Sequence, residues 1–207
     1  MKRPNYLQLL GLMCALSVLL GGCLIKPARV PTRHFILATI PAPEQAPATT
    51  QQVSVEVSFV KMPSYLLRDS MSVRKSPTEI EYLQGALWAE RLDRCFQQTL
   101  ANNLSSLLSS NRVDLPPLDH ERVVVRVSVD MKQFDVDTQG RGTLIAGWRI
   151  TDPSKNRPLK SGQAHLAEVG ASPRANPQVI ATTLSALTAG FSRELARAIR
   201  EAAQAKP

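Results

Sequence analysis

The chain has 207 residues, of which 43% are hydrophobic, and a formal net charge of +8 at pH 7. This length and composition allow one domain with a buried core and exclude an intrinsically disordered chain. The positive charge suits anionic membrane headgroups, nucleic acid, or a generally basic surface that has no specific partner.

The first 23 residues are typical of a lipoprotein signal peptide. Lys2 and Arg3 precede an uncharged apolar run from Leu7 to Leu20, which is too short to cross ~30 Å of hydrocarbon as a helix. The small residues in the tetrapeptide Leu20–Cys23 (LGGC) are the processing pattern of a bacterial lipoprotein. We therefore predict a signal peptide over residues 1–22 and lipidation of Cys23. The alternative is an ordinary cleaved signal that a cysteine happens to follow.

Lipidation predicts a protein that stays on a membrane without a transmembrane helix, because buried acyl chains anchor it. Removal of residues 1–22 leaves 185 residues with a formal charge of +6, and an exported lipoprotein rarely meets nucleic acid. The residue after the predicted lipidated cysteine is Leu24. An Asp at this position tends to retain lipoproteins at the inner membrane, so its absence favours the periplasmic face of the outer membrane. Because Cys14 is removed and Cys23 is lipidated, Cys95 remains alone and an intramolecular disulfide is excluded.

Residues 23–33 are predicted to be a lipidated tether, and residues 34–207 a single domain. At roughly 3.5 Å per residue the tether reaches about 35 Å at most, which keeps the domain close to its membrane. The domain is expected to begin with a strand over residues 34–40. A proline-containing loop over 41–52 follows and shows no apolar period.

Alternation of apolar and polar residues predicts further strands. Val53, Val55, Val57 and Phe59 indicate a half-buried strand that ends before Pro63. Two short strands flanking a turn predict a hairpin, and three more after the first helix predict a meander. These five strands are expected over residues 71–74, 79–82, 123–134, 143–150 and 159–169.

Apolar residues at helical spacing predict two long helices. The first is expected over residues 87–109, and its apolar stripe is Trp88, Leu92, Phe96, Leu100, Leu104 and Leu108. Cys95 lies beside this stripe, so a buried structural thiol is the expected role. The second is expected over 177–204, with Asn176 as the N-cap and Pro177 in the first turn.

The order of strands, helix, three-stranded meander and helix indicates an α+β fold. We predict a mainly antiparallel β-sheet with two long amphipathic helices packed on one face, preceded by the lipoprotein signal peptide. Since each helix has a single apolar stripe, the other face of the sheet is expected to be polar or covered by a partner.

Residues with catalytic or metal-binding chemistry are scattered along the chain. His34, His120 and His165 lie in different elements, without a second ligand at metal-binding spacing. Asp135 and Asp137 are spaced to share a strand face, as an acid–base pair or a cation site would require. Their position before a glycine turn favours local hydrogen bonding instead. We therefore predict no catalytic residue, no metal, no cofactor and no enzymatic activity.

The segment from Tyr65 to Asp69 mixes large apolar and charged side chains between two predicted strands. Two interpretations remain open. In the first, Tyr65, Leu66, Arg68 and Asp69 form a contact surface for a partner. In the second, the segment is a crossover that places Tyr65 and Leu66 in the core.

Several short pieces of the sequence become specific through their order and spacing. They are Leu20–Cys23, Pro63–Arg68 (PSYLLR), Met71–Arg74 (MSVR), Glu79–Tyr82 (EIEY), Trp88–Leu92 (WAERL), and the later hairpin residues Phe134, Asp137, Gly140, Leu144, Ala146 and Trp148. In these pieces the chain resembles the ABC-type transport auxiliary lipoproteins, the group that includes PqiC and is associated with membrane integrity. The resemblance covers nearly the whole mature chain, although the 41–52 loop has no counterpart.

The resemblance implies a non-catalytic accessory or adaptor component of an MCE-type intermembrane lipid transport system. The implied partners are an MCE-domain tunnel protein of the PqiB type and its inner-membrane or ABC-transporter components. A homo-oligomer would fit a ring-forming partner. Two other functions stay open: a periplasmic carrier that holds an acyl chain between helices and sheet, and a structural or pilotin-like envelope lipoprotein.

Overall fold

The computed structural model describes residues 31–41, 53–110, 113–116, 125–174 and 176–204. The elements described below belong to one structural unit, which begins at Thr32. The predicted signal peptide, Cys23, most of the tether, most of the 41–52 loop and His120 lie outside the described residues.

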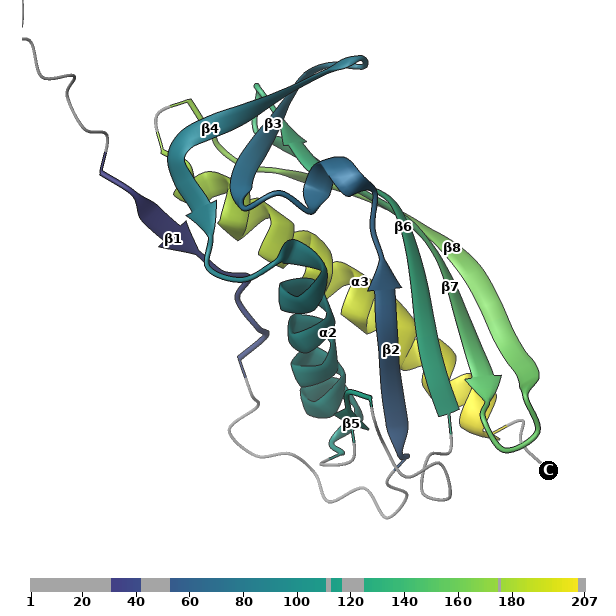
Figure 1. Cartoon of the computed structure of the whole chain (residues 1–207). Coiled ribbons are helices and arrows are strands. Elements are labelled where there is room, and N and C mark those ends of the chain that lie inside the picture. Colours follow the sequence, from purple (N-terminus) through teal and green to yellow (C-terminus); the bar gives the residue numbers. More distant parts are fainter. Residues whose placement is uncertain (1–30, 42–52, 111–112, 117–124, 175, 205–207) are drawn as a thin grey trace, which may run out of the picture. The chain divides into compact units, whose positions relative to one another are not determined.

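An eight-stranded sheet forms the framework of the described part of the chain (Figure 1). Its strands are β1 (Arg33–Phe35), β2 (Val55–Lys61), β3 (Ser70–Ser76), β4 (Glu79–Trp88), β5 (Val113–Asp114), β6 (Val125–Asp137), β7 (Arg141–Asp152) and β8 (Arg157–Val169). Strand β6 is central: β7 pairs along one side of it, and β8 pairs with β7. On its other side β6 pairs first with β2 and then with β3, so these two strands follow one another along the same neighbour.

The α+β fold predicted from the sequence is confirmed, and the sheet is mixed. The long β6–β7 and β7–β8 pairings and the β3–β4 hairpin are antiparallel. Strands β2 and β3 run parallel to β6, while β1 runs parallel to β4 and β5 parallel to β2. The chain crosses over from β2 to β3 without reversing its direction, so both strands run parallel to β6.

Two long helices, α2 (Leu92–Leu108) and α3 (Gln178–Gln204), pack on one face of this sheet. Their apolar stripes meet the sheet at three fully buried rings, Phe96 of α2, Phe134 of β6 and Phe191 of α3. The Phe96 ring lies edge-on to Phe134 with centroids 5.2 Å apart, and 6.0 Å from the Phe191 ring. Burial of each such side chain stabilises the fold by about 1.5–3 kcal/mol.

The first helix begins later than predicted, because β4 extends to Trp88. Residues Ala86, Leu87 and Trp88 pair with β1, and the Trp88 N–H donates to the Asp69 carbonyl at 2.7 Å. The Trp88 side chain is buried as expected, but from a strand. The four-residue spacing between Trp88 and Leu92 therefore joins two different elements by coincidence.

The first strand is also shorter than predicted, because the segment after Phe35 leaves the sheet and crosses the helices. Side chains of the helices accept hydrogen bonds from its backbone instead of a neighbouring strand. The N–H groups of Leu37, Ala38 and Ile40 donate to Cys95 Sγ (3.3 Å), Ser185 Oγ (2.8 Å) and Asn103 Oδ1 (2.8 Å).

The alternation predicted for β2 breaks at Phe59. Val55 and Val57 are buried as predicted, but the pairing with β6 is irregular between Val57 and Val60, and Phe59 is 76% exposed. An inserted residue shifts the two-residue period by one, so the side chain that alternation assigned to the core is turned to the surface.

Apart from the short strand β5, which was not predicted, the remaining elements agree with the predictions within a few residues. The β3–β4 hairpin turns at Pro77 and Thr78, and the three-stranded meander is β6, β7 and β8. Helix α3 begins where predicted, with Asn176 Oδ1 accepting the Gln178 N–H at 3.1 Å.

Substitution of Asn103 tests whether buried polar groups fix the position of the segment after β1. Its amide accepts from Ile40 and donates to Ser192 Oγ of α3 at 3.1 Å in a fully buried position. Asn103→Ala should lower the free energy of unfolding by about 1–3 kcal/mol, because buried groups lose their partners. Asn102→Ala, on the exposed side of the same helix, should change it by less than about 0.5 kcal/mol. Chemical denaturation of both variants measures this, and equal losses would contradict the assigned role.

Candidate functional site

The segment between β2 and β3 is a crossover whose central part is the short 3-10 helix η2 (Ser64–Leu66). Pro63 precedes η2, and its carbonyl accepts the Leu66 N–H at 3.0 Å. Leu66 is 3% exposed and belongs to the core, and Tyr65 is half-buried against it. Tyr65 and Leu66 therefore lie where the second interpretation placed them, in a crossover that packs against the core.

Asp135 on β6 anchors this crossover through hydrogen bonds to both neighbouring elements. Its Oδ2 accepts the Tyr65 hydroxyl at 2.8 Å and the Arg74 Nη2 at 2.5 Å, and Arg74 Nε lies 3.0–3.1 Å from the two carboxylate oxygens. Gln133 Nε2 donates to its Oδ1 at 2.9 Å. The Tyr82 hydroxyl of β4 completes the cluster by donating to the Tyr65 carbonyl at 3.1 Å.

The charges and burial in this cluster keep the Tyr65 hydroxyl protonated and the Arg74 guanidinium charged. Burial and the adjacent Asp135 carboxylate raise the pKa of Tyr65 well above its usual range, so the hydroxyl remains a donor. The hydrogen bond to Asp135 raises the pKa of Arg74 further. Hydrogen-bond donors from within the domain thus occupy both carboxylate oxygens of Asp135. This arrangement is typical of an ion pair with a structural role.

Asp135 and Asp137 differ in role, although both lie on β6. Asp137 Oδ1 accepts the backbone N–H groups of Gln139 and Arg141 at 2.8 and 2.9 Å, which is the turn role predicted for it. Asp135 is 3% exposed and bonds side chains far away in sequence, so the local turn role expected for it is wrong. The sequence carried no signal for this, because Tyr65 and Arg74 lie more than 60 residues away.

The other candidate residues are separated in the structure. His34 is on β1 and His165 on β8, and no group of three or more His, Cys, Asp or Glu residues within the described ranges could hold a metal ion. Cys95 is buried, as expected, and burial raises the pKa of its thiol. In the crossover, Arg68 and Asp69 are exposed, and the Arg68 guanidinium lies 5.0 Å from the centre of the Tyr82 ring. Their contact with a partner stays a prediction.

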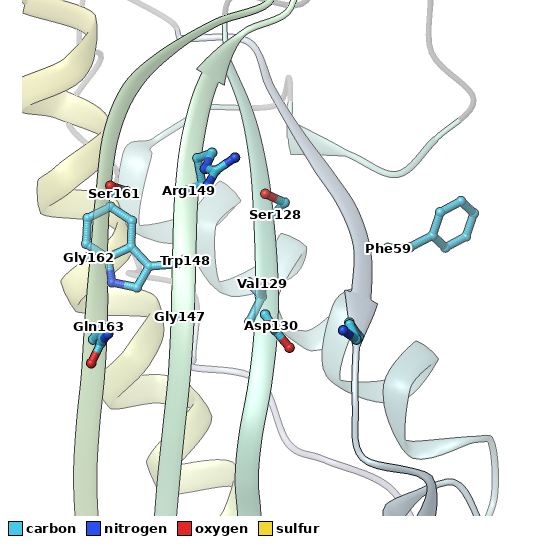
Figure 2. A pocket seen from close by; sticks show the side chains of 11 residues that line it. Phe59, Ser128, Val129, Asp130, Gly147, Trp148, Arg149, Ser161, Gly162 and Gln163 are labelled. Carbon is cyan, nitrogen blue, oxygen red and sulfur yellow. The ribbon is translucent and has the colours of Figure 1, made fainter.

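A groove of about 560 Å³ lies across four strands of the sheet, and the sequence patterns did not predict it. Figure 2 shows the groove with the helices behind the sheet. Residues from β2, β6, β7 and β8 line it: Phe59, Lys61, Ser128, Val129, Asp130, Gly147, Trp148, Arg149, Ser161, Gly162 and Gln163. Gly147 lies between Asp130 and Gln163 in the register, and a Cβ at this position would meet no atom within 4 Å. The groove is therefore open above the Gly147 backbone.

The charges on this face leave two cations at the groove. Asp130 accepts from Lys132 Nζ at 2.6 Å, which lowers the pKa of its carboxyl, and Glu56 on β2 pairs with Arg126. Lys61 stands opposite Asp130 in the register, and its charge also lowers the pKa of that carboxyl, but within the described part of the chain no carboxylate lies at ion-pair distance from Lys61 or Arg149. The groove is thus positively charged, with an exposed phenyl ring at its side.

Comparison with known families identifies the class of protein. The family described as the ABC-type transport auxiliary lipoprotein component matches residues 35–196, which is most of the chain. The chain belongs to this family. Membership makes it an auxiliary lipoprotein component of transport, anchored to a membrane of the cell envelope, and confirms the resemblance seen in the sequence.

Solved structures support the fold of this auxiliary lipoprotein. One, described only as an uncharacterized protein, is 20% identical over 82% of this chain and 99% of its own, with a TM-score of 0.67. Protein XCC0632 from Xanthomonas campestris is 15% identical over 84% of this chain and 97% of its own, also with a TM-score of 0.67. At these identities the likeness establishes the fold alone. None of the curated proteins compared with the chain matches it.

Substitutions at Asp135 test the structural role of the crossover cluster. Asp135→Ala should destabilise this auxiliary lipoprotein by about 3 kcal/mol, because it leaves the Arg74 charge without its buried partner. Tyr65→Phe removes one donor and should cost about 1 kcal/mol. Asp137→Ala is the matched control and should also cost only about 1 kcal/mol. Urea unfolding of the three variants measures these changes, and a loss at Asp137 as large as at Asp135 would refute the assignment.

Proposed function

We propose that this auxiliary lipoprotein is a non-catalytic adaptor of an MCE-type intermembrane lipid transport system, held at the periplasmic face of the outer membrane. One observation carries the proposal: the outer face of the sheet has a charged groove, and no described helix packs on it. The buried ionic cluster at Asp135, by contrast, has its donors and acceptors bound within the fold. An open charged surface, together with a buried polar cluster that is satisfied internally, suits binding better than catalysis.

The membrane attachment of the adaptor rests on Cys23 and its lipid. None of the described helices is long and apolar enough to cross a membrane. Acyl chains contribute roughly 0.8 kcal/mol per buried CH₂, so more than one chain gives stable anchoring. The tether allows the domain to work only within about 35 Å of the lipid, at roughly 3.5 Å per residue.

The partner that we propose is an MCE-domain tunnel protein of the PqiB type, with its inner-membrane or ABC-transporter components. The adaptor would bind the end of the tunnel that approaches the outer membrane. Of the four residues predicted as a contact surface, Arg68 and Asp69 are exposed and form one candidate contact with this partner, whereas Tyr65 and Leu66 pack into the domain and position the crossover. The groove on the outer face of the sheet forms a second.

A lipid carrier fits the structure less well than an adaptor. A carrier needs space for an acyl chain between helices and sheet, and this layer is occupied by the Phe96 ring, which contacts the rings of Phe134 and Phe191. Three grooves that described residues line are open to the surface instead. Phospholipid that co-purifies with the protein and no tunnel protein would favour the carrier.

Cys23→Ala tests the anchoring. The variant should lose acyl labelling and its place in the outer-membrane fraction, because the lipid is the proposed anchor. It should then appear as a soluble protein or as a precursor held at the inner membrane. Cys14→Ala, within the signal peptide, serves as the control and should leave the fractionation unchanged. Outer-membrane localisation of the Cys23→Ala protein would refute the lipoprotein assignment.

The adaptor role is tested by chemical crosslinking of the full-length lipoprotein in native membranes, followed by purification and mass spectrometry. Recovery of an MCE-domain protein with the wild type is the expected result. The Cys23→Ala protein is the matched control and should recover much less of it, because it is no longer held at the outer membrane. Recovery of other envelope proteins without any MCE-domain protein would refute the proposal.

A further inference from the structure

Phe59 is the most unusual side chain on the outer face of the sheet. It is an aromatic residue in the middle of the domain, 76% exposed, and Figure 2 shows it projecting from β2 on the side away from β6. It is not on a loop tip or a chain end, where exposure would follow from position. A large exposed ring beside a groove is typical of the anchors that dominate protein–protein interfaces.

The exposure of Phe59 is built into the fold by Gln97. This side chain is 5% exposed on the buried face of α2, and its Nε2 donates to the carbonyls of Val57 (2.9 Å) and Ser58 (3.0 Å). These two carbonyls lie at the irregularity of β2 that turns Phe59 outward. A buried polar residue thus stabilises the bulge, and bulges commonly re-aim a side chain at functional sites.

The neighbouring groove supplies the second part of a binding surface. Its floor is open above Gly147, where glycine is not required by packing, since nothing lies within 4 Å of a Cβ there. Glycine weakens a strand interior, and where it persists it often marks a place that another backbone approaches closely. Lys61 and Arg149 line the same groove, and Lys132 neutralises Asp130 beside them.

We propose that Phe59 and this groove bind a segment of a protein partner that carries an apolar pocket or side chain flanked by carboxylates. The phenyl ring would anchor the apolar part, Lys61 and Arg149 would pair with the carboxylates, and the segment backbone would lie over Gly147. This inference deepens the proposed function. It depends on that function only for the identity of the envelope protein that supplies the segment.

A protein segment suits this surface better than a bilayer. Exposed aromatic residues beside lysines also occur where proteins dock on membranes. A bilayer presents a broad surface, however, whereas the cations and the exposed phenyl ring lie along one groove of about 560 Å³ that crosses four strands. An extended segment that is one residue wide can enter it.

The test uses the full-length lipoprotein in native membranes, with a benzophenone amino acid at Gln163, an exposed residue in the groove. Irradiation should crosslink position 163 to a protein, and mass spectrometry should map the adduct to a segment with apolar residues flanked by Asp or Glu. The same probe at Lys155, in the exposed turn between β7 and β8, should give no such adduct.

Three variants combined with the probe at position 163 test the named residues. Phe59→Ala, Lys61→Gln and Gly147→Val should each lower the adduct yield about tenfold or more, as loss of an interface anchor does. Their melting temperatures should not fall, because the first two change exposed side chains and valine suits an uncrowded strand position. The matched control Ala167→Val, on β8 outside the groove, should retain the adduct.

The outcomes separate this inference from the proposed function. An adduct with the expected chemistry on a protein other than an MCE-domain protein supports the docking surface and overturns the proposed partner. An adduct with phospholipid, an adduct on a segment without carboxylates, or no adduct at all overturns the docking surface. Undiminished yields in Phe59→Ala and Gly147→Val overturn it as well, even where the adduct is an MCE-domain protein.

Discussion

The packing of both long helices on one face of the sheet is the constraint on which the rest of this structure depends. Phe96 of α2 meets Phe134 of the central strand and Phe191 of α3 in one buried cluster, so the three elements share a single core. Dense packing of this kind leaves little room for a ligand inside. The uncovered face of the sheet, which carries the groove, is the surface that we propose for binding.

Three buried polar side chains hold the places where the chain departs from regular structure. Asn103 binds the segment that leaves the sheet after β1, Gln97 binds the bulge in β2, and Asp135 binds the crossover from β2 to β3. Each would destabilise the core without partners, because an unpaired buried polar group costs more than a hydrogen bond returns. The hydrogen bonds of these three side chains thus fix the conformation of irregular backbone. The bulge in β2 also determines which side chain is exposed on the outer surface.

The family, the tether and the open face form a consistent account of an auxiliary lipoprotein. A domain held by lipid near a bilayer needs a surface for its partner more than a site for chemistry. The positive groove, the exposed Phe59 and the crossover residues Arg68 and Asp69 provide such surfaces on the part of the domain that the helices do not cover.

The sequence by itself determined the elements, their order, the α+β class and the family, because the two-residue and helical periods and the spaced family residues are local signals. Residues such as Val127, Leu104 and Leu195 therefore lie in the core as the periods predict. Only the tertiary structure decided the positions of Trp88, Phe59 and Asp135. Pairing with β1 kept Trp88 in a strand, a bulge held by Gln97 turned Phe59 outward, and Tyr65 and Arg74 converted Asp135 into a buried anchor. In each case the partner is distant in sequence, and periodicity carries no information about contacts between distant residues.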